Sequence, residues 1–533
     1  MEEFDYIIVG AGSAGCVVAA RLSENPRNRV LLLEAGGSDR RWDVRIPLAV
    51  SKLWPNPALT WGFLSEPEGE LDGRRLPVAR GRMLGGTSSL NGMMAIRGHR
   101  ADYDGWRDQG LTSWGWDDLL PWFRKLEHHW RGDTPTHGGS GPLSVEPHPA
   151  PSPLMGPAIA AARSLGYPIT QDFNGEETDG FGMPDFTTRN GRRCSAADAY
   201  LRPAMRRPNL EVRTGAVATR VLLEGRRAVG IAYRRGGQDI EVRATREVVL
   251  AGGAINSPQL LMLSGIGPAA QLAEPGIEPV ADSPEVGENL QDHPGAGLEF
   301  DLAPSLSFDH ALRFDRLAAS FGRWLLGRGS VLGAPPLAIS ANVATQPGSR
   351  EIDLHLLLIP LSMQSRVWFP GLRQPFGPRM GAMWSLNYPK SRGWLRLASA
   401  DPLAHPRIQF NLLSDPDDRA AMLHGYHRLR ELLAQPALAE VTGAIRRPEQ
   451  ELTSDEEVLA YIRATAATAY HPCGTCRMGA DDQAVVDGEL RVRGVQGLRV
   501  ADASIFPRLP GGNTNLPVIM VAERAAAFIT SAG

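Results

Sequence analysis

The sequence predicts an α/β protein built around a doubly wound, Rossmann-like parallel sheet. Three observations lead to this prediction. A short buried strand at residues 4–9 runs directly into a glycine-rich turn and a helix. Further short apolar runs at 30–33, 248–250 and 498–501 are typical of buried parallel strands. Residues 300–450 mix strands with amphipathic helices, which indicates a second domain.

The first forty residues carry a dinucleotide-binding fingerprint. Residues 10–15 read Gly-Ala-Gly-Ser-Ala-Gly, between the first strand and a helical stretch, CVVAARLSE. Gly10 permits a tight turn, Gly12 lets the backbone approach a pyrophosphate, and Gly15 lets helix and strand pack closely. The helix N-terminus would then present its free N–H groups to the phosphates.

The second strand ends at Glu34, where an acidic side chain would accept hydrogen bonds from ribose hydroxyls. An acidic residue at this point argues against a 2′-phosphate, so FAD or NAD is favoured over NADP. The predicted contacts of this unit are Gly10, Gly12, Ser13, Ala14, Gly15, Glu34 and Ala35.

Composition excludes several classes of protein. The 533 residues are 43% hydrophobic and 22% charged, which rules out a disordered acidic chain, a collagen-like repeat and a disulfide-rich miniprotein. The 56 lysines and arginines nearly balance the 59 aspartates and glutamates, so no global field favours nucleic acid or an anionic membrane. The 58 glycines and 42 prolines predict many tight turns, as expected of a chain that wraps a large ligand.

Cysteine usage and apolar stretches bear on the compartment. Four cysteines are too few for a secreted disulfide scaffold of this length. The first residues lack the basic and apolar regions of a signal peptide. No apolar stretch reaches the ~18–20 residues that a membrane span needs. The expected location is therefore the cytoplasm, with no transmembrane segment.

The middle of the chain is rich in short strands. Residues 210–213, 218–223, 229–233 and 240–242 are predicted to form a small antiparallel meander, after which the strand at 248–250 returns to the nucleotide-binding sheet. A helix is expected over 516–529, with Pro517 near its first position.

Two loops have distinctive compositions. Residues 80–93 are rich in glycine and hydroxyl groups, and would bring backbone amides close to a flat or anionic ligand. Residues 132–142 are expected to form a mobile loop, such as a lid.

These motifs resemble the glucose-methanol-choline (GMC) oxidoreductase family over essentially the whole chain. The segments that carry the resemblance are the fingerprint, GRMLGGTSSLNGM (81–93), GGAINSPQLLMLSGIGP (252–268), VGENLQDH (286–293), HPCGTCRMG (471–479) and VADASIFPRLPGGNTNLP (500–517). Within the family the chain looks most like bacterial choline-dehydrogenase-type alcohol dehydrogenases and oxidases, hydroxymethylfurfural oxidase and pyridoxine oxidase. The resemblance implies FAD in a discontinuous domain of residues 1–150, 208–300 and 465–533. It implies a substrate domain of residues 151–207 and 301–464, with an antiparallel sheet.

The resemblance also assigns cofactor contacts. Residues 91–94 would lie beside the flavin ring, Val217 would hold the adenine through its backbone, and Asp502 and Ala503 would contact the ribityl and phosphate region. Thr514 and the helix after it would face the pyrimidine end of the ring, where a helix N-terminus stabilises negative charge. The contacts expected beyond the fingerprint are Leu84, Gly86, Ser88, Asn91, Gly92, Met93, Met94, Val217, Ala251, Asp502, Ala503, Thr514, Asn515 and Leu516. Some choline oxidases carry a flavin-linked histidine where this chain has Leu90, so FAD is expected to be noncovalent.

The chemistry expected is oxidation of an alcohol to an aldehyde. His471 heads the segment HPCGTCRMG and matches the catalytic histidine of the family; an imidazole titrates near neutral pH and suits a general base. Asn513 matches the second catalytic position, where an amide can orient the substrate oxygen but cannot act as a base. Proton abstraction by His471 would accompany hydride transfer to flavin N5.

The expected substrate is a neutral primary alcohol, aromatic, furanic or medium-chain, because no anionic cluster that would hold a cation is apparent. Trp61, Met363, Trp368, Phe369 and Tyr470 are the candidate pocket walls. No metal is expected, because Cys473 and Cys476 have no second pair and read as buried thiols.

The sequence is also compatible with other activities. The same fold could carry a hydroxynitrile-lyase-type activity, a fatty-acid photodecarboxylase-type activity, or a relic cofactor site in a binding protein. The sequence leaves open whether oxygen or a quinone accepts the electrons, and which oligomer forms.

Overall fold

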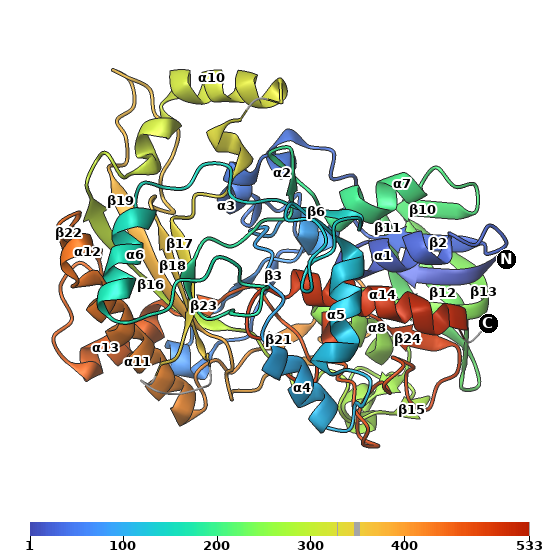
Figure 1. Ribbon diagram of the computed structural model, residues 1–533. Helices are drawn as coiled ribbons and strands as arrows, with labels where there is room; N and C mark the ends of the chain where they lie inside the picture. Colours follow the sequence, from blue (N-terminus) through green and yellow to red (C-terminus); the bar gives the residue numbers. More distant parts are fainter. Residues whose placement is uncertain (328, 346–351, 532–533) are drawn as a thin grey trace.

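Two seven-stranded sheets and the helices packed on them form the body of the protein (Figure 1). The structure, a computed structural model, describes residues 1–327, 329–345 and 352–531. The predicted fold class is confirmed: a doubly wound, mainly parallel sheet is joined to an antiparallel one.

The first sheet has the order β10-β2-β1-β13-β12-β11, with β24 paired to β13. Its parallel strands are β10 (Leu210–Thr214), β2 (Val30–Glu34), β1 (Glu2–Val9), β13 (Gln238–Leu250) and β24 (Leu498–Val500), and the antiparallel extension is β12 (Arg227–Arg235) and β11 (Ala216–Glu224). All of β2 is buried, as expected for a parallel sheet covered on both faces.

Two details of this sheet differ from the sequence prediction. Residues 210–213 belong to β10, which pairs in parallel with β2 at the sheet edge and does not start a meander. Residues 240–242 and 248–250 are one strand, because β13 runs unbroken through both. Its polar middle at Thr245 and Arg246 reads as a turn in sequence, but the structure absorbs these residues in a register shift against β1.

The ends of the chain meet beside this sheet. Helix α1 (Ser13–Leu22) packs on α14 (Asn515–Ser531), which covers the helix predicted at 516–529 (Figure 1). The buried carboxylate of Glu523 on α14 binds Arg21 of α1 at 2.7 Å and Lys125 of α5 (Trp116–Leu126) at 3.1 Å, and accepts a hydrogen bond from the Tyr200 hydroxyl. A buried charge is tolerated only when it is paired, so Glu523 ties these helices together.

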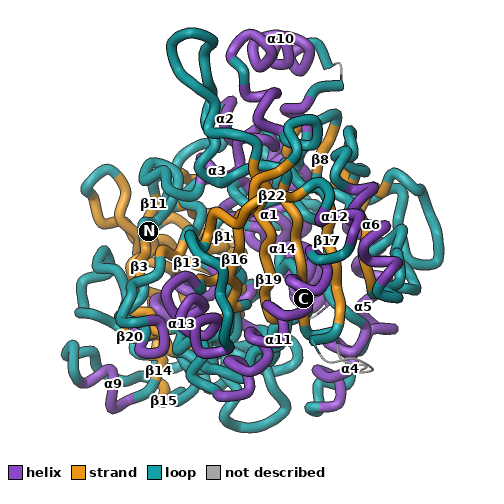
Figure 2. Tube along the Cα trace, turned by 90° about the vertical axis from the view of Figure 1, so that its left-hand side faces the viewer, coloured by secondary structure: helices purple, strands orange, loops and turns teal. Residues whose placement is uncertain are grey.

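The second sheet is antiparallel, in the order β22-β16-β19-β18-β17-β7, with β23 paired to β16. Its strands are β22 (Thr442–Arg447), β16 (Pro294–Leu302), β19 (Arg379–Leu386), β18 (Leu354–Ile359), β17 (Ile339–Val343), β7 (Gly180–Gly182) and β23 (Ala467–Thr468). Helix α11 (Pro416–Leu433) packs on β19, with α6 (Met155–Ser164), α12 (Pro436–Ala439) and α13 (Asp455–Thr465) around it (Figure 2). Leu354, Leu356 and Leu358 are buried on one side of β18, so the residues between them face the other way.

Short elements complete the chain. They are α2 (Trp42–Arg45), α3 (Val50–Leu53), β3 (Phe63–Leu64), β4 (Pro77–Val78), α4 (Arg100–Asp108), β5 (Glu127–His129), β6 (Leu143–Val145), β8 (Thr188–Arg189), β9 (Arg192–Arg193), α7 (Arg202–Ala204), α8 (Gly253–Leu263), β14 (Ile266–Gly267), α9 (Ala269–Ala273), β15 (Ala281–Asp282), α10 (Phe314–Leu325), β20 (Trp394–Arg396) and β21 (Arg407–Gln409). The predicted domain boundaries stay a prediction; β16 and β23 belong to the second sheet, although those boundaries assign β23 and most of β16 to the cofactor domain.

The turn from β1 into α1 depends on contact between backbones. Gly10 has a φ of +97°, a conformation that side chains rarely adopt. A Cβ at Gly15 would lie 1.8 Å from the carbonyl oxygen of Gly10, so only a hydrogen atom fits there. Above Gly12 the space is open, and the nearest atom to a Cβ would be the carbonyl oxygen of Ala251 at 4.0 Å.

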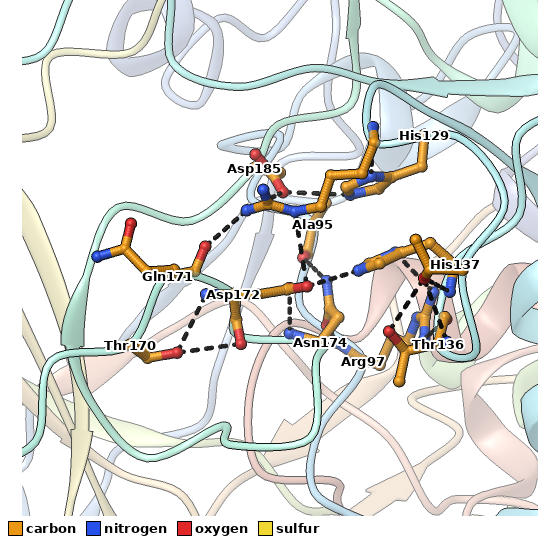
Figure 3. A network of polar contacts seen from close by, with 12 residues as sticks. Ala95, Arg97, His129, Thr136, His137, Thr170, Gln171, Asp172, Asn174 and Asp185 are labelled. Atoms are coloured by element: carbon orange, nitrogen blue, oxygen red, sulfur yellow. Dashed lines mark hydrogen bonds and ion pairs between the residues drawn. The ribbon is translucent and has the colours of Figure 1, made fainter.

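The loop at 132–142 is anchored by buried charges (Figure 3). The ring of His137 lies between two carboxylates, with Nε2 2.7 Å from Asp172 and Nδ1 2.9 Å from Glu127. The ring of His129 stacks on it, with centroids 3.7 Å apart, and pairs with Asp185 at 3.1 Å. This anchoring is at odds with the mobile loop that the sequence suggests.

The same network forms hydrogen bonds to the segment that follows residues 91–94. The amide of Asn174 donates to the carbonyl of Ala95 (2.6 Å) and accepts from the N–H of Arg97 (2.9 Å). The guanidinium of Arg97 in turn binds Glu127 and donates to the carbonyl of Thr136. Figure 3 shows Asp172 and Asn174 next to each other, with His137 and Ala95 beside them. The network therefore fixes the backbone next to the predicted flavin contacts.

Gly15→Ala is expected to lower the free energy of unfolding by about 3 kcal/mol, because the added methyl group must displace backbone. Urea denaturation of the purified protein measures this change. Gly105→Ala in α4 is the matched control, since a Cβ there meets nothing within 4 Å; it should leave stability unchanged or raised. Equal stability of the two variants would contradict the account.

His137→Gln is expected to cost about 3 kcal/mol at mildly acidic pH, because it removes the buried cation between Asp172 and Glu127 and leaves these carboxylates only their arginine partners. Burial lowers the pKa of His137, but hydrogen bonds to Asp172 and Glu127 outweigh it, and the net pKa is raised. This stabilisation is therefore present below the ordinary imidazole pKa of about 6.5 and is lost as the pH rises through the folded value.

Unfolding free energies of the wild type and His137→Gln, measured across this pH range, test the prediction. The exposed His427, paired with Asp455 at the surface, provides the control His427→Gln. A difference between wild type and His137→Gln that does not shrink as the pH rises would refute the assignment.

Candidate active site

A cavity of about 460 Å³ lies between the two sheets, within the size range of small-molecule and cofactor sites. It brings together most of the residues predicted from the sequence. Those that line it are Gly10, Gly12, Ser13, Ala14, Glu34, Ala35, Trp61, Gly86, Asn91, Gly92, Met93, Met94, Val217, Ala251, Met363, Tyr470, His471, Asp502, Ala503, Asn513, Thr514 and Asn515. Gly15, Leu84, Ser88, Leu516, Trp368 and Phe369 lie outside its lining.

Some of the residues outside the lining support it from behind. The carbonyl oxygen of Leu84 accepts a hydrogen bond from the hydroxyl of Ser89, at 2.9 Å. The hydroxyl of Ser88 donates to the carbonyl of Gly85 at 2.6 Å. Leu516 is buried in the first turn of α14. These residues shape the backbone that faces the cavity.

Glu34 stands at the end of β2, at one end of the cavity. Its carboxylate accepts the N–H groups of Ala11 (2.9 Å) and Gly36 (2.7 Å). Burial raises its pKa to about 7 despite these donors. The position suits hydrogen bonding to the hydroxyls of a ribose.

The two glycine-rich segments touch each other at the cavity wall. Gly86 has a φ of +51°, and a Cβ there would lie 2.7 Å from the Cα of Gly12. Beyond it the side-chain oxygen of Asn91 accepts from Arg193 (2.8 Å) and from the N–H of Met93 (3.2 Å). The close contact between Gly86 and Gly12 leaves backbone, rather than side chains, on this part of the cavity wall, where a ligand can approach it.

The N-termini of three helices converge on the cavity. Gly12 precedes α1, Gly253 begins α8 and Asn515 begins α14, and all three line the cavity. Asp502 accepts the N–H of Gly253 (2.8 Å), and the hydroxyl of Ser13 donates to Asn515 (2.8 Å). Asp502 thus caps α8, while the positive N-terminal ends of α1 and α14 favour a diphosphate, so the chain's own residues fit a dinucleotide.

His471 and Asn513, the two predicted catalytic residues, are in contact. His471 Nε2 lies 3.2 Å from Asn513 Nδ2, and His471 Nδ1 lies 3.0 Å from Nδ1 of His293. In the orientation that the structure assigns to the amide, Nδ2 can only donate, so Nε2 of His471 is the unprotonated acceptor. Its proton then sits on Nδ1 and is donated to His293. The lone pair of the base therefore lies at Nε2, beside the cavity, where a substrate hydroxyl would replace the contact with the Asn513 amide.

The surroundings of His471 keep it neutral. Burial first, then repulsion from His293, Arg80 and His355, hold its pKa well below the ordinary value. Its backbone N–H donates to Asp292 at 2.9 Å, and burial raises the pKa of that carboxyl to about 7. An imidazole that is neutral at neutral pH is ready to accept a proton.

One acceptor in the site is unfilled. The side-chain oxygen of Asn513 is buried and has no hydrogen-bond partner among the described residues. A buried polar atom without a partner is costly, and a ligand that donates a hydrogen bond would satisfy it.

Aromatic and aliphatic side chains form the wall opposite these polar groups. The Trp54 and Tyr470 rings are 5.5 Å apart, and Trp61 stacks on Phe63 at 5.6 Å. Met363 also lines the cavity. The predicted walls Trp368 and Phe369 point elsewhere: the indole N–H of Trp368 donates to the Asp309 carbonyl, and Phe369 stacks on Phe314.

Sequence reasoning missed two histidines of the site. His355, whose Nε2 lies 2.9 Å from the hydroxyl of Ser340, lines the cavity with Leu357 and Ile359. In a β-strand, side chains at every second position point to the same side. A strand over 354–359 therefore places His355, Leu357 and Ile359 on one face, and this was the signal that the sequence offered. His293 ends the segment VGENLQDH, and nothing local marks it as a partner of a residue 178 positions later.

Charges are distributed unevenly along the cavity. Among the described residues that line it, the only carboxylates are Glu34 and Asp502, both at the dinucleotide end. Arg80 lines the other end, donates to the carbonyl of Tyr470, and has its pKa lowered by burial to about 10, so it stays cationic at neutral pH. The carboxyl of Asp292 lies behind this end and interacts electrostatically with Arg80, so it partly offsets that charge, but the lining itself carries a cation and no carboxylate among the described residues.

The described residues show neither a metal cluster nor a membrane span. No group of three or more His, Cys, Asp or Glu side chains is arranged there to hold a metal ion. Cys473 and Cys476 are buried free thiols whose pKa is raised by burial. Over the same parts of the chain, no helix is long and apolar enough to cross a bilayer.

The chain matches a known protein family over most of its length. Models of the GMC oxidoreductase family match residues 4–295 and 389–522. The chain belongs to the GMC oxidoreductase family. As a GMC oxidoreductase, it is an FAD-dependent enzyme that acts on CH–OH donors.

Relatives of this GMC enzyme, and solved structures of other proteins similar to it, match almost its whole length. The oxygen-dependent choline dehydrogenases of Sinorhizobium medicae and Brucella anthropi are each 41% identical over 529 residues, covering 98% and 99% of this chain and 95% of theirs. The pyridoxine 4-oxidase from Mesorbium loti is 32% identical with a TM-score of 0.87, covering 98% of both chains. A variant formate oxidase from Aspergillus oryzae RIB40 is 28% identical with a TM-score of 0.92, covering 100% of this chain and 98% of its own.

The FAD is predicted to be noncovalent. Leu90 lines the cavity and packs with Val44, Leu53 and Met83, and it offers no nucleophile to the flavin. Precipitation of the holoenzyme with trichloroacetic acid should leave the flavin in the supernatant. Yellow colour that stays with the protein pellet would contradict this prediction.

Proposed function

We propose that the protein oxidises a neutral primary alcohol, aromatic, furanic or medium-chain aliphatic, to the aldehyde. The observation that carries the proposal is the substrate end of the cavity. There His471, held neutral, and Asn513 line the cavity together with aromatic and aliphatic side chains, and none of the described residues that line this end is a carboxylate. Such a surface suits a hydroxyl group on an apolar, uncharged body.

The chain's own residues account for the proton. The hydroxyl of the alcohol lies between Nε2 of His471 and the amide of Asn513, and the imidazole takes the proton as the C–H bond breaks. His293 accepts a hydrogen bond from Nδ1–H of His471, which holds the ring in the tautomer that leaves Nε2 free. Bound FAD supplies the acceptor for the hydride, at N5. The predicted contacts of individual residues with FAD remain part of this proposal.

Choline is the second candidate substrate, because two relatives are named choline dehydrogenases. Aromatic rings such as Trp54, Trp61 and Tyr470 can surround a quaternary ammonium group. Here, however, the cation Arg80 lines this end of the cavity, and none of the described residues that line it is a carboxylate. A quaternary ammonium group would gain no ion pair with this lining, which favours an uncharged alcohol over choline.

Two alternatives keep the fold but change the reaction. A hydroxynitrile-lyase-type activity would not change the redox state of the flavin, and a fatty-acid photodecarboxylase-type activity would require light. Oxygen and a quinone both remain candidates for the electron acceptor. Parallel assays for hydrogen peroxide and for reduction of a quinone-like dye distinguish these two acceptors.

Anaerobic mixing of the holoenzyme with benzyl alcohol is expected to bleach the flavin absorbance, because hydride transfer reduces it. Choline at the same concentration should bleach it far more slowly. His471→Ala should slow bleaching by ~10²–10⁴-fold while FAD stays bound, since the general base is lost. His427→Ala, at an exposed histidine, is the control and should behave like the wild type.

Each other outcome points to a specific error. An undiminished rate in His471→Ala would overturn the assignment of the base. Bleaching by choline alone would favour the second candidate. No bleaching by any alcohol would favour a lyase, and carbon dioxide release from a fatty acid only on illumination would favour a decarboxylase.

A further inference from the structure

Helix α10 stands at one pole of the molecule, apart from both sheets (Figures 1 and 2). Its apolar side chains Phe314, Leu317, Phe321, Trp324 and Leu325 recur at helical spacing, so they share one face. Trp324 is buried, but Phe314 and Leu325 are about half exposed. Part of the apolar face of α10 is therefore open to solvent.

Two neighbouring segments extend this apolar surface. Trp42 of α2 lies 6.1 Å from Phe321 and 6.0 Å from Trp324, measured between ring centroids. In the loop at 363–376, Phe369 stacks on Phe314 at 4.8 Å. We call the joint surface of residues 38–53, 313–326 and 363–376 the polar cap, because it lies at one pole of the molecule; the name refers to its position and not to its chemistry.

Large exposed apolar side chains concentrate on the polar cap. Six of the twelve that are strongly exposed in the described chain lie there, so they form a cluster and are not scattered singly. Leu372 is 90% exposed and Leu326 is 71% exposed. The six are Trp42, Phe314, Leu325, Leu326, Met363 and Leu372.

The polar cap is also strongly cationic. Its three segments hold nine arginines and lysines against three aspartates, in a chain whose net charge is −3. Each aspartate is already paired with an arginine: Asp39 with Arg202, Asp43 with Arg41, and Asp315 with Arg313. The nine cations are Arg40, Arg41, Arg45, Lys52, Arg313, Arg316, Arg323, Arg366 and Arg373.

We propose that the polar cap docks the enzyme onto the surface of an anionic lipid bilayer. An amphipathic helix with exposed aromatic and leucine side chains, flanked by arginines, is the pattern of a helix that lies in a membrane interface. The long arginine side chains can reach lipid phosphates while the apolar side chains enter the acyl boundary.

Charge argues against a second copy of this chain as the occupant. A two-fold interface through the polar cap would bring the same nine cations against each other, and such like-charge contact is costly. An anionic bilayer instead complements both the apolar side chains and the unpaired arginines.

The docked position has a consequence for substrate delivery. Met363 lines the active-site cavity and is also half exposed on the polar cap. The amino group of Lys52 donates to the carbonyl of Ser365, which joins this loop to α3. Docking would therefore set one wall of the cavity against the bilayer, where apolar alcohols and quinones concentrate.

Vesicle flotation with the holoenzyme tests the proposal. Vesicles of phosphatidylcholine with added phosphatidylglycerol should carry the enzyme at low salt, and binding should weaken in ~0.5 M salt, where screening is strong. Pure phosphatidylcholine vesicles should bind it much less. Flavin absorbance reports the holoenzyme, so the test does not depend on turnover or on the proposed substrate.

Two double variants separate charge from apolar contact. Arg316→Glu with Arg323→Glu should reduce binding by about 30-fold or more, since each cation near an anionic surface contributes. Leu326→Asp with Leu372→Asp should reduce it similarly, and both sites are exposed enough to leave folding intact. Arg27→Glu with Arg163→Glu makes the same charge change at exposed positions outside the polar cap and should bind like the wild type.

Three results would overturn the proposal. The first is no binding to the anionic vesicles at low salt, and the second is an equal loss of binding in the control variant. The third is a concentration-dependent dimer that Leu326→Asp with Leu372→Asp abolishes, because the polar cap would then be an interface between copies.

Discussion

Direct contact between backbones at the glycine-rich turns is the constraint on which the rest of this structure depends. Gly15 meets the carbonyl of Gly10, and Gly86 meets the Cα of Gly12. Because no side chain lies between them, the backbones of the turn from β1 into α1 and of the glycine-rich segment at 80–93 are in direct contact. The helix N-termini of α1, α8 and α14 can then reach the same ligand. Any Cβ at these contacts would push apart the elements that hold the cofactor.

Buried charges supply the second layer of order. Glu523 joins α1, α5 and α14 behind the cofactor site, and the Arg97, Glu127 and His137 network holds the segment beside residues 91–94. These groups cannot be hydrated, so their pairing restricts how the surrounding backbone can move. The proposed catalytic histidine depends on the same principle. Burial and nearby cations keep His471 neutral, which an exposed imidazole would not be at mildly acidic pH.

Local patterns were enough to predict the cofactor half of the protein. The strand, glycine turn and helix at 4–24, the acid at Glu34 and the strand at 498–501 are short-range signals, and each appears in the first sheet or its turn. Two errors arose where pairing is long-range. The edge position of β10 and the unbroken course of β13 depend on partner strands far away in the sequence, β2 and β1, which local alternation does not encode.

The substrate half was less predictable for a similar reason. Trp368 and Phe369 were plausible walls by composition, but the direction of their side chains is set by contacts with Asp309 and Phe314. His355 enters the cavity only because β18 presents alternate residues to it. His137 looked like part of a mobile polar loop, and only the fold reveals the two carboxylates that bury it.

The central claim is that the cavity holds His471 as a neutral base beside an alcohol. The most direct measurement is the rate at which a saturating primary alcohol bleaches the bound flavin under anaerobic conditions, followed as a function of pH. Because the pKa of His471 is lowered, the account predicts a constant rate at and above the ordinary imidazole value of about 6.5, with a decline only below it. A rate that still climbs well above that value would contradict the account.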